Sequence, residues 1–184
     1  MRTCVLLDAS VLVPASPRDT LLRAAHEGLY SMRITEDIMG EVRRNLVKQR
    51  GITEEKAQHL IHKVTESFPE AFVVQYESLI VSMPNHEKDR HVLAAAVICR
   101  SQIIVTQNVR HFSKDCLAPF GIEAQTIDEF LVYLVHLAPE QMVQIVMMQA
   151  GDLRDPPMSV LELLGKLERH APTFAQSVQE ILNH

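Results

Sequence analysis

The sequence predicts an α/β domain with a mainly parallel sheet, followed by a C-terminal helical appendage. Short aliphatic runs alternate with longer amphipathic stretches up to about residue 138, as expected of strands joined by crossover helices. From residue 139 onward the strand pattern is absent and the composition becomes rich in Met and Gln. Hydrophobic residues make up 47% of the 184-residue chain, enough for a substantial core. We therefore expect one domain over residues 1–138 and a helical extension over residues 139–184.

The chain is expected to begin with a buried strand. The run CVLLD, residues 4–8, is short and aliphatic and ends in an acid. Pro14 and Pro17 are expected to break the chain after this strand. A helical pattern then covers residues 18–29, where Gly28 closes it.

Two capped helices are expected next. Thr35 and Thr53 stand in N-cap positions ahead of helical stretches, which cover residues 36–50 and 54–68. The first stretch has acids in its first turn and cations in its last turn, as the helix dipole prefers, and Gly51 stops it.

The rest of the first domain should alternate strands with helices. Strands are expected at residues 72–75, 103–106 and 122–126, and helices at 87–100 and 128–137. In the extension, helices are expected at residues 140–150, 158–169 and 173–183.

Composition limits the partners and the compartment. The net charge of −5 argues against a surface coated with basic residues, although a local basic face beside an acidic pocket remains compatible with it. Cys4, Cys99 and Cys116 have no C-x-x-C spacing and are expected to be free thiols. The sequence has no run of about 18 apolar residues, so it predicts no membrane span. Asp8 interrupts the N-terminal apolar run, which does not resemble a signal peptide, so we expect a cytoplasmic protein.

Polar residues gather where the predicted elements begin and end. Asp8 closes the first strand, Thr106 and Asn108 follow the strand at 103–106, and Asp89 opens the helix that leads into that strand. The carboxyl ends of parallel strands meet at one edge of a sheet, where ligands bind. Glu41 lies on the helix at 36–50, from which its side chain could reach the same edge. Three converging carboxylates repel one another unless a cation or shifted pKa values intervene, and Mg²⁺ or Mn²⁺ prefers such oxygen ligands.

Each of these residues also has an ordinary structural explanation. Asp89 favours the helix dipole, Glu41 can pair with Arg44 or Lys48, and Asn108 can shape a turn. Their joint placement is what favours a site. Other chemistries lack their motifs, since the sequence has no Walker loop, no G-x-G-x-x-G and no G-x-S-x-G.

Four segments together resemble a PIN domain, and in particular the VapC-like toxins of prokaryotic toxin–antitoxin pairs. The segments are DASVLVP at residues 8–14, EVRRNL with Glu41, DRHVLAAA at 89–96 and IVTQN at 104–108. The resemblance covers about residues 3–130. It implies a three-layer α/β/α sandwich whose acidic pocket binds Mg²⁺ or Mn²⁺ and cleaves single-stranded RNA.

The resemblance also implies roles for individual residues. Asp8, Glu41 and Asp89 would be the catalytic, metal-binding acids, and Ser10, Thr106, Asn108 and His111 would orient them. The family commonly ends its last motif as T-x-N-x-x-D-F, whereas this chain has TQNVRHF, so His111 stands where a fourth acid is usual. Asp115 supplies the missing metal-binding carboxylate if the loop bends back. Otherwise the pocket contains three acids and an imidazole, which Mn²⁺ tolerates better than Mg²⁺.

Cations flank the predicted acids despite the negative net charge. Arg43, Arg44, Arg90 and Arg110 are the expected contacts to the RNA backbone, and a solvated helix face is the alternative for the first two.

The predicted function is a metal-dependent endoribonuclease, the toxin of a type II toxin–antitoxin pair. Its metal ions would activate a water for attack on the phosphodiester. The expected partners are an RNA substrate, a cognate antitoxin protein and a second copy of the chain in a homodimer. Two alternatives remain: a catalytically impaired PIN fold that binds RNA or a partner, and a housekeeping RNA-processing nuclease.

Overall fold

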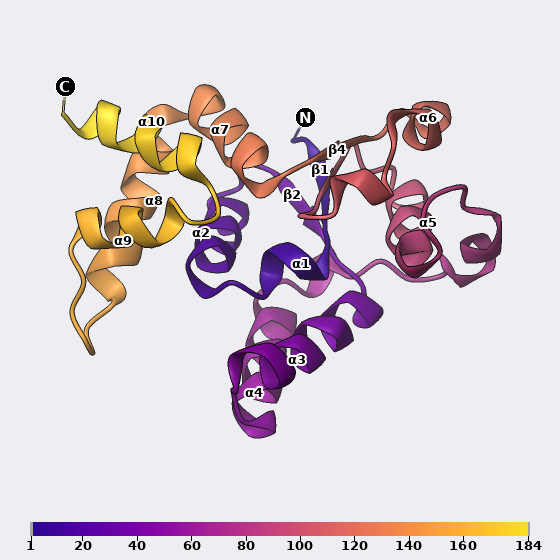
Figure 1. Cartoon of the computed structure of the whole chain (residues 1–184), viewed down its shortest axis with the longest axis horizontal. Coiled ribbons are helices and arrows are strands. Elements are labelled where there is room, and N and C mark those ends of the chain that lie inside the picture. Colours follow the sequence, from indigo (N-terminus) through magenta and orange to yellow (C-terminus); the bar gives the residue numbers. More distant parts are fainter. Residues whose placement is uncertain (1, 184) are drawn as a thin grey trace.

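The computed structural model describes residues 2–183 and shows a four-stranded parallel sheet flanked by helices (Figure 1). The strands are β1 (Cys4–Leu7), β2 (Ser31–Arg33), β3 (Ile103–Val105) and β4 (Glu123–Gln125). Their order across the sheet is β2-β1-β3-β4, and every neighbouring pair is parallel. The predicted α/β class with a parallel sheet is therefore confirmed.

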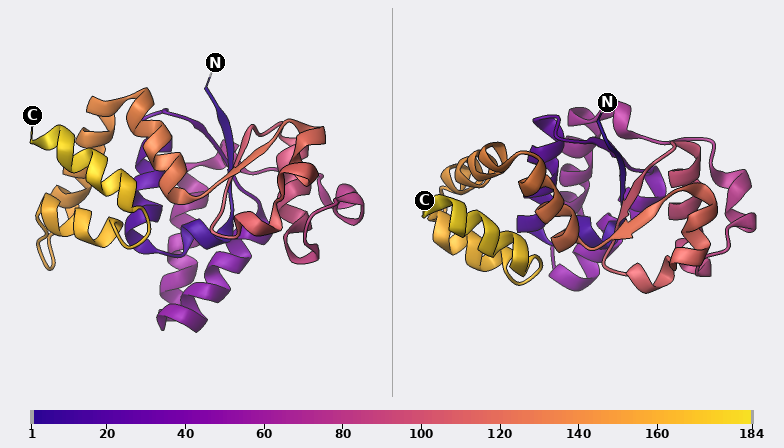
Figure 2. Two further views of the ribbon diagram at one scale, coloured as in Figure 1. Left: turned by 45° about the horizontal axis from the view of Figure 1, so that its top comes forward. Right: turned by 90° about the horizontal axis from the view of Figure 1, so that it is seen from above.

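The centre of the sheet is covered on both faces. Val5, Leu6 and Leu7 of β1 are fully buried, and so are Ile104 and Val105 of β3. Continuous apolar strands of this kind are typical of parallel sheets packed between two layers of helices. The two views of Figure 2 show α5 (Arg90–Ile98) on one side of the sheet and α2 (Ala15–His26) with α7 (Ile127–Leu137) on the other.

Within residues 2–183, seven further helices surround this central arrangement. They are α1 (Ala9–Leu12), α3 (Glu36–Arg50), α4 (Glu54–Ser67), α6 (Lys114–Leu117), α8 (Pro139–Asp152), α9 (Val160–Leu167) and α10 (Pro172–Leu182). Short 3₁₀ turns join them: η1 (Pro69–Ala71), η2 (Glu77–Ser82), η3 (Glu87–Asp89), η4 (Val109–His111) and η5 (Ala118–Phe120). Helices α3 and α4 form a hairpin that projects from the carboxyl side of the sheet, at the bottom of Figure 1.

The capping residues predicted for this hairpin are confirmed. The Thr35 hydroxyl accepts a hydrogen bond from the Ile38 backbone N–H at 3.0 Å, and Thr53 accepts one from Lys56 at 3.4 Å. Gly51 ends α3 with a left-handed backbone, φ 63°, a conformation that glycine adopts without a steric penalty.

Two local predictions were wrong. Pro17 does not break the chain, because α2 begins at Ala15 and Pro17 lies in its first turn, where a backbone N–H has no acceptor within the helix. Residues 72–75 do not form a strand; Phe72 makes only one parallel bridge, to Ile34, and the left-handed Gln75 at φ 65° turns the chain away. The strand β2, which was not predicted, pairs with β1 on the side away from β3.

The C-terminal helices pack on α2 and on one another. Met142, Ile145 and Val146 of α8 are buried, together with Leu167 of α9 and Phe174 of α10. Because α7 contacts α8 and α10 as well as β4, it links the sheet to the appendage. The boundary at residue 139 stays a prediction. Among the described residues, no single helix is long and apolar enough to cross a membrane; α7 and α8 pass that test only together, across a bend of 119°.

One buried polar contact joins the appendage to the first domain. Gln149 of α8 is 1% exposed, and its side chain accepts a hydrogen bond from the Thr20 hydroxyl of α2 at 2.7 Å and donates one to the Ser16 carbonyl at 3.0 Å. Buried amides are stabilising only when they are paired in this way.

Replacing Gln149 with Ala should therefore destabilise the protein by about 1–3 kcal/mol, because the change leaves a small cavity and removes both bonds. Gln144 lies exposed on the same helix, so Gln144→Ala is the matched control and should change stability by less than about 0.5 kcal/mol. Urea unfolding followed by circular dichroism measures both. Equal effects of the two substitutions would show that the hydrogen bonds of Gln149 contribute nothing to the free energy of unfolding.

Candidate metal-binding site at the carboxyl edge of the sheet

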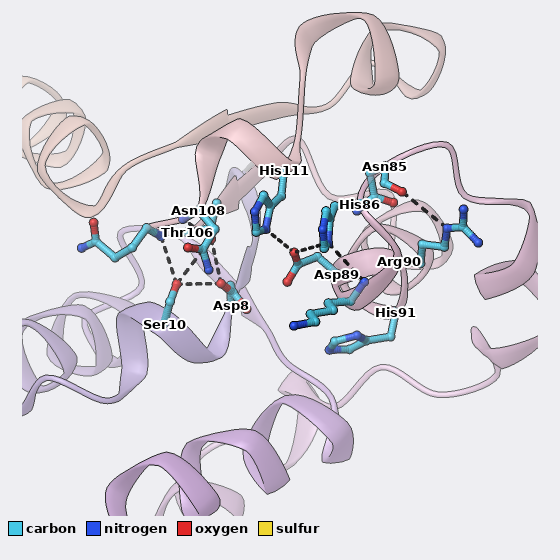
Figure 3. A network of polar contacts seen from close by, with 12 residues as sticks. Asp8, Ser10, Asn85, His86, Asp89, Arg90, His91, Thr106, Asn108 and His111 are labelled. Atoms are coloured by element: carbon cyan, nitrogen blue, oxygen red, sulfur yellow. Dashed lines mark hydrogen bonds and ion pairs between the residues drawn. The ribbon is translucent and has the colours of Figure 1, made fainter. Parts of the chain in front are cut away.

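Asp8 is the most buried acid of the predicted site. It follows β1 directly, is 3% exposed, and its backbone N–H donates to the Val105 carbonyl of the neighbouring strand at 3.0 Å. One carboxylate oxygen, Oδ2, accepts hydrogen bonds from the Ser10 hydroxyl at 2.6 Å and the Thr106 hydroxyl at 2.7 Å (Figure 3). Two hydroxyl donors on one oxygen fix the orientation of the carboxylate.

The hydroxyls that hold Asp8 are themselves fixed by the chain that leaves β3. The Gln107 N–H donates to Ser10 Oγ, and the Asn108 N–H donates to Thr106 Oγ1, both at 3.0 Å. The start of α1 and the end of β3 are thereby held together (Figure 3). Ser10 and Thr106 thus lie where the predicted orienting residues were expected. Asn108 contributes a backbone bond here, and the role of its side chain stays a prediction.

Glu41 reaches this edge from α3. Its side chain is 34% exposed, and Oε1 lies 3.7 Å from Nε2 of His91 on α5. Burial raises the pKa of the Glu41 carboxyl above its ordinary value; His91 opposes this shift, and the negative charges of Asp8 and Asp89 add to it. The three predicted acids are therefore close enough to act on one another electrostatically.

Asp89 lies at the end of η3, immediately before α5. Its Oδ2 is 2.6 Å from His111 Nδ1, a short hydrogen bond, and 3.9 Å from His86 Nδ1. Figure 3 shows both imidazole rings directed at this carboxylate. His111 therefore contacts the acid that it was predicted to orient.

Asp115 is not part of this group in the structure. It is exposed in the first turn of α6, and within residues 2–183 it forms no hydrogen bond or ion pair with Asp8, Glu41 or Asp89. Its predicted role as a metal ligand has no support from the geometry and stays a prediction.

Two histidines of the site, His86 and His91, were given no role from the sequence. His86 approaches Asp89, and His91 approaches Glu41. His91 Nε2 is buried and has no hydrogen-bond partner among the described residues, so a buried polar atom points toward the acids without being satisfied. The i,i+3 spacing of His86 and Asp89 is a signal that could have been read from the sequence.

The four arginines predicted to bind RNA differ in their surroundings. Arg43 forms an ion pair with Glu54 of α4, and Arg90 donates to the Asn85 carbonyl at 3.4 Å. Arg44 and Arg110 are exposed and have no ion-pair partner within the described part of the chain. These two are the better placed to contact a polyanion.

The donor set fits a hard divalent cation. Asp8, Glu41 and Asp89 offer carboxylate oxygens; burial raises the pKa of Glu41, and repulsion by the charges of Asp8 and Asp89 adds to this rise. A divalent ion relieves such repulsion, and oxygen ligands are those that Mg²⁺ and Mn²⁺ prefer.

Comparison with known proteins decides the family. The sequence profile described as "PIN domain" matches residues 2–110, more than half of the chain. The chain belongs to the PIN-domain family. The three-layer arrangement around a parallel sheet is thus a PIN fold, and the expected family is confirmed.

The PIN domain is followed by a second recognisable segment. A profile described as "VapC50 C-terminal domain" matches residues 127–180, from α7 to α10. A protein of Mycobacterium tuberculosis named "Putative ribonuclease VapC50" is 40% identical over 111 residues, which are 60% of this chain and 66% of that protein. The chain thus spans just under two thirds of this relative. No solved structure matches the chain.

The raised pKa of Glu41 gives a prediction for the metal-free PIN domain. A carboxyl whose pKa is higher in the folded than in the unfolded chain stabilises the fold below the unfolded pKa, about 4.3, and this contribution is lost as pH rises through the folded pKa. Glu41→Gln should therefore raise the melting temperature by about 1–3 °C at pH 7 without metal. The gain should disappear near pH 4.

Glu36→Gln is the control, since Glu36 is exposed on the same helix and interacts favourably with the helix dipole. It should leave the melting temperature unchanged or slightly lower at pH 7. Differential scanning calorimetry in the presence of a chelator measures both variants. A melting temperature of Glu41→Gln below that of the wild type at pH 7 would contradict the repulsion among the acids.

Proposed function

We propose that this PIN-domain protein is a metal-dependent endoribonuclease, acting as the toxin of a type II toxin–antitoxin pair on single-stranded RNA. The observation that carries the proposal is the convergence of Asp8, Glu41 and Asp89 from three separate segments on the carboxyl edge of the sheet. The name of the similar mycobacterial protein supports the ribonuclease class.

Asp8, Glu41 and Asp89 would hold the ion, Mg²⁺ or Mn²⁺. When bound, it supplies positive charge that activates a water and stabilises the charge developing on the phosphate. The chain's own contribution is positioning. Ser10 and Thr106 hold the Asp8 carboxylate through one oxygen, and His111 holds Asp89 in the same way. Groups that orient ligands commonly change affinity or activity by about 10–100-fold when they are removed.

The proposed partners follow from the same assignment. They are the RNA substrate, a cognate antitoxin protein and a second copy of the chain, in the cytoplasm. The match of residues 127–180 to the C-terminal domain named after VapC50 supports placing the chain in this group of PIN proteins.

A second candidate function is binding without cleavage. His111 occupies the position where the family usually has a fourth acid, and it already takes up one oxygen of Asp89. A pocket weakened in this way could retain RNA or partner binding alone. Titration with Mn²⁺ distinguishes the two, because a pocket that stays empty at millimolar Mn²⁺ favours the binding protein. A housekeeping RNA-processing nuclease is separated from a toxin by whether induction of the protein arrests growth.

Asp8→Asn should abolish RNA cleavage, lowering the rate by at least about 100-fold, because an amide is a poorer ligand for a hard cation than a carboxylate. The fold should persist, since the amide oxygen can still accept from Ser10 and Thr106. Cleavage of a labelled single-stranded RNA with Mg²⁺ or Mn²⁺, together with circular dichroism, measures both effects. Asp115→Asn is the comparison: the exposed position of Asp115 predicts activity near that of the wild type. A fully active Asp8→Asn protein would remove the proposed mechanism.

RNA affinity should depend on salt through the exposed arginines. Arg44→Ala and Arg110→Ala should each weaken RNA binding and lower the slope of log affinity against log salt by about 0.7, the value for one lost phosphate contact to a single strand. Arg169 is exposed on the C-terminal appendage, so Arg169→Ala should leave the slope unchanged. Filter binding with Ca²⁺ in place of the catalytic ion measures the slope. Equal slopes for all three variants and the wild type would place the RNA elsewhere.

A further inference from the structure

Asp89, one of the acids of the pocket, also forms a cluster with two histidines, His86 and His111. One potential ligand atom from each lies within 4.8 Å of the other two. His86 precedes η3, Asp89 ends it, and His111 ends η4. Backbone bonds fix these turns, since the Asp89 N–H donates to the His86 carbonyl at 2.9 Å and the His86 N–H to the His111 carbonyl at 3.4 Å.

The two imidazole rings are arranged in parallel. Their centroids are 4.3 Å apart and their planes differ by 14°, so the rings are stacked. In this arrangement both Nδ1 atoms face the same carboxylate oxygen of Asp89, one at 2.6 Å and the other at 3.9 Å (Figure 3). Around a zinc ion with ligand distances of about 2.0–2.1 Å, neighbouring ligands in a tetrahedral shell lie about 3.3–3.4 Å apart. The three atoms thus need small side-chain rotations to surround one ion, and the proton that His111 Nδ1 and Asp89 Oδ2 share is released to solvent when the ion binds.

A hydrogen-bonded pair alone accounts for only part of this cluster. His111 binds Asp89 Oδ2 directly, but His86 is too far away to share that oxygen by a hydrogen bond. The described partner of His86 Nδ1 is the Lys88 backbone N–H, at a long 3.4 Å, so this nitrogen acts as an acceptor with a weak donor. A nitrogen whose lone pair accepts only this long hydrogen bond, next to a carboxylate and a second imidazole, is suited to a cation.

We propose that His86, Asp89 and His111 form a binding site for a zinc-class divalent ion, with Asp89 shared between this site and the acidic pocket. Two imidazoles and one carboxylate are the three-ligand set that leaves a fourth position of zinc open to water. Nitrogen ligands favour Zn²⁺, Co²⁺ or Mn²⁺ over Mg²⁺, which keeps to oxygen. The half-exposed His86 leaves the cluster accessible from solvent. The inference does not rest on the proposed nuclease activity.

The ion would also connect parts of the fold that now meet through few bonds. His86 and Asp89 belong to the segment before α5, and His111 belongs to the loop after β3. Coordination would fix these two segments to each other. It would also engage Asp89, an acid on which the neighbouring pocket depends. Occupancy of the histidine site would in this way alter how a second ion is held by Asp8 and Glu41.

The test is binding of Co²⁺ and Zn²⁺ to the full chain, measured by calorimetry for Zn²⁺ and by the visible absorption of bound Co²⁺. His86→Gln and His111→Gln should each weaken binding at least about tenfold and reduce the Co²⁺ absorption bands that arise from nitrogen ligands. Circular dichroism confirms that both variants are folded, and having two variants at separate positions protects the test against the misfolding of one.

His62→Gln is the matched control. His62 is exposed on α4 and pairs with Glu66 at 3.2 Å, so it represents the weak metal binding of any surface His–Glu pair. It should leave the affinity within about twofold of the wild type. If His62→Gln weakens binding as much as His86→Gln does, the ion binds at the surface and the proposal is overturned.

Asp8→Asn separates the two metal sites. It should retain the Co²⁺ spectrum, because Asp8 is not a ligand of the histidine cluster. Loss of that spectrum in Asp8→Asn but not in His86→Gln would place the ion in the acidic pocket and overturn the proposal. Neither result depends on RNA cleavage, so the histidine site can fail while the proposed nuclease function stands, and the reverse also holds.

Discussion

Repulsion between carboxylates at one edge of a parallel sheet is the constraint on which this structure depends. Asp8, Glu41 and Asp89 are far apart in the sequence, yet the fold brings them close enough that the charges of Asp8 and Asp89 add to the rise in the pKa of Glu41 that burial causes. A fold that brings such groups together gives up stability unless a cation compensates. The parallel sheet makes the convergence possible, because β1 and the crossovers that lead into β3 all present residues at the same edge.

The surrounding side chains restrain the acids in two different ways. Asp8 is held by neutral hydroxyls, those of Ser10 and Thr106, which orient its carboxylate without adding charge. Asp89 is held by imidazole, which is also a metal ligand in its own right. The two ends of the pocket therefore differ in chemistry, and a cation that prefers oxygen is favoured near Asp8 while one that accepts nitrogen is favoured near Asp89.

The sequence predicted the elements whose signals are local, and it was less reliable where packing decides. The helices begin after Thr35 and Thr53, and α3 ends at Gly51, as expected. Each of these residues acts through its own backbone and its near neighbours. Residues 72–75 have the composition of a strand but not its pairing, because the chain beside them turns at Gln75 after one bridge to Ile34. For the site, the acids and hydroxyls were found from strand ends and from a family resemblance. The i,i+3 spacing of His86 and Asp89 is visible in the sequence, but whether the ring approaches the carboxylate depends on a 3₁₀ turn that was not predicted, and His86 was therefore missed.

The bond between Asp8 and Thr106 joins residues separated by 98 positions. During synthesis on the ribosome, the first aspartate therefore emerges long before the hydroxyl that orients it, and the sheet cannot pair β1 with β3 until the intervening helices have been made. The pocket therefore cannot assemble before the residues up to Thr106 have been made. Until then Asp8 lacks the hydroxyl of Thr106 that orients it, so the acids cannot be arranged around a cation while β3 is still unmade.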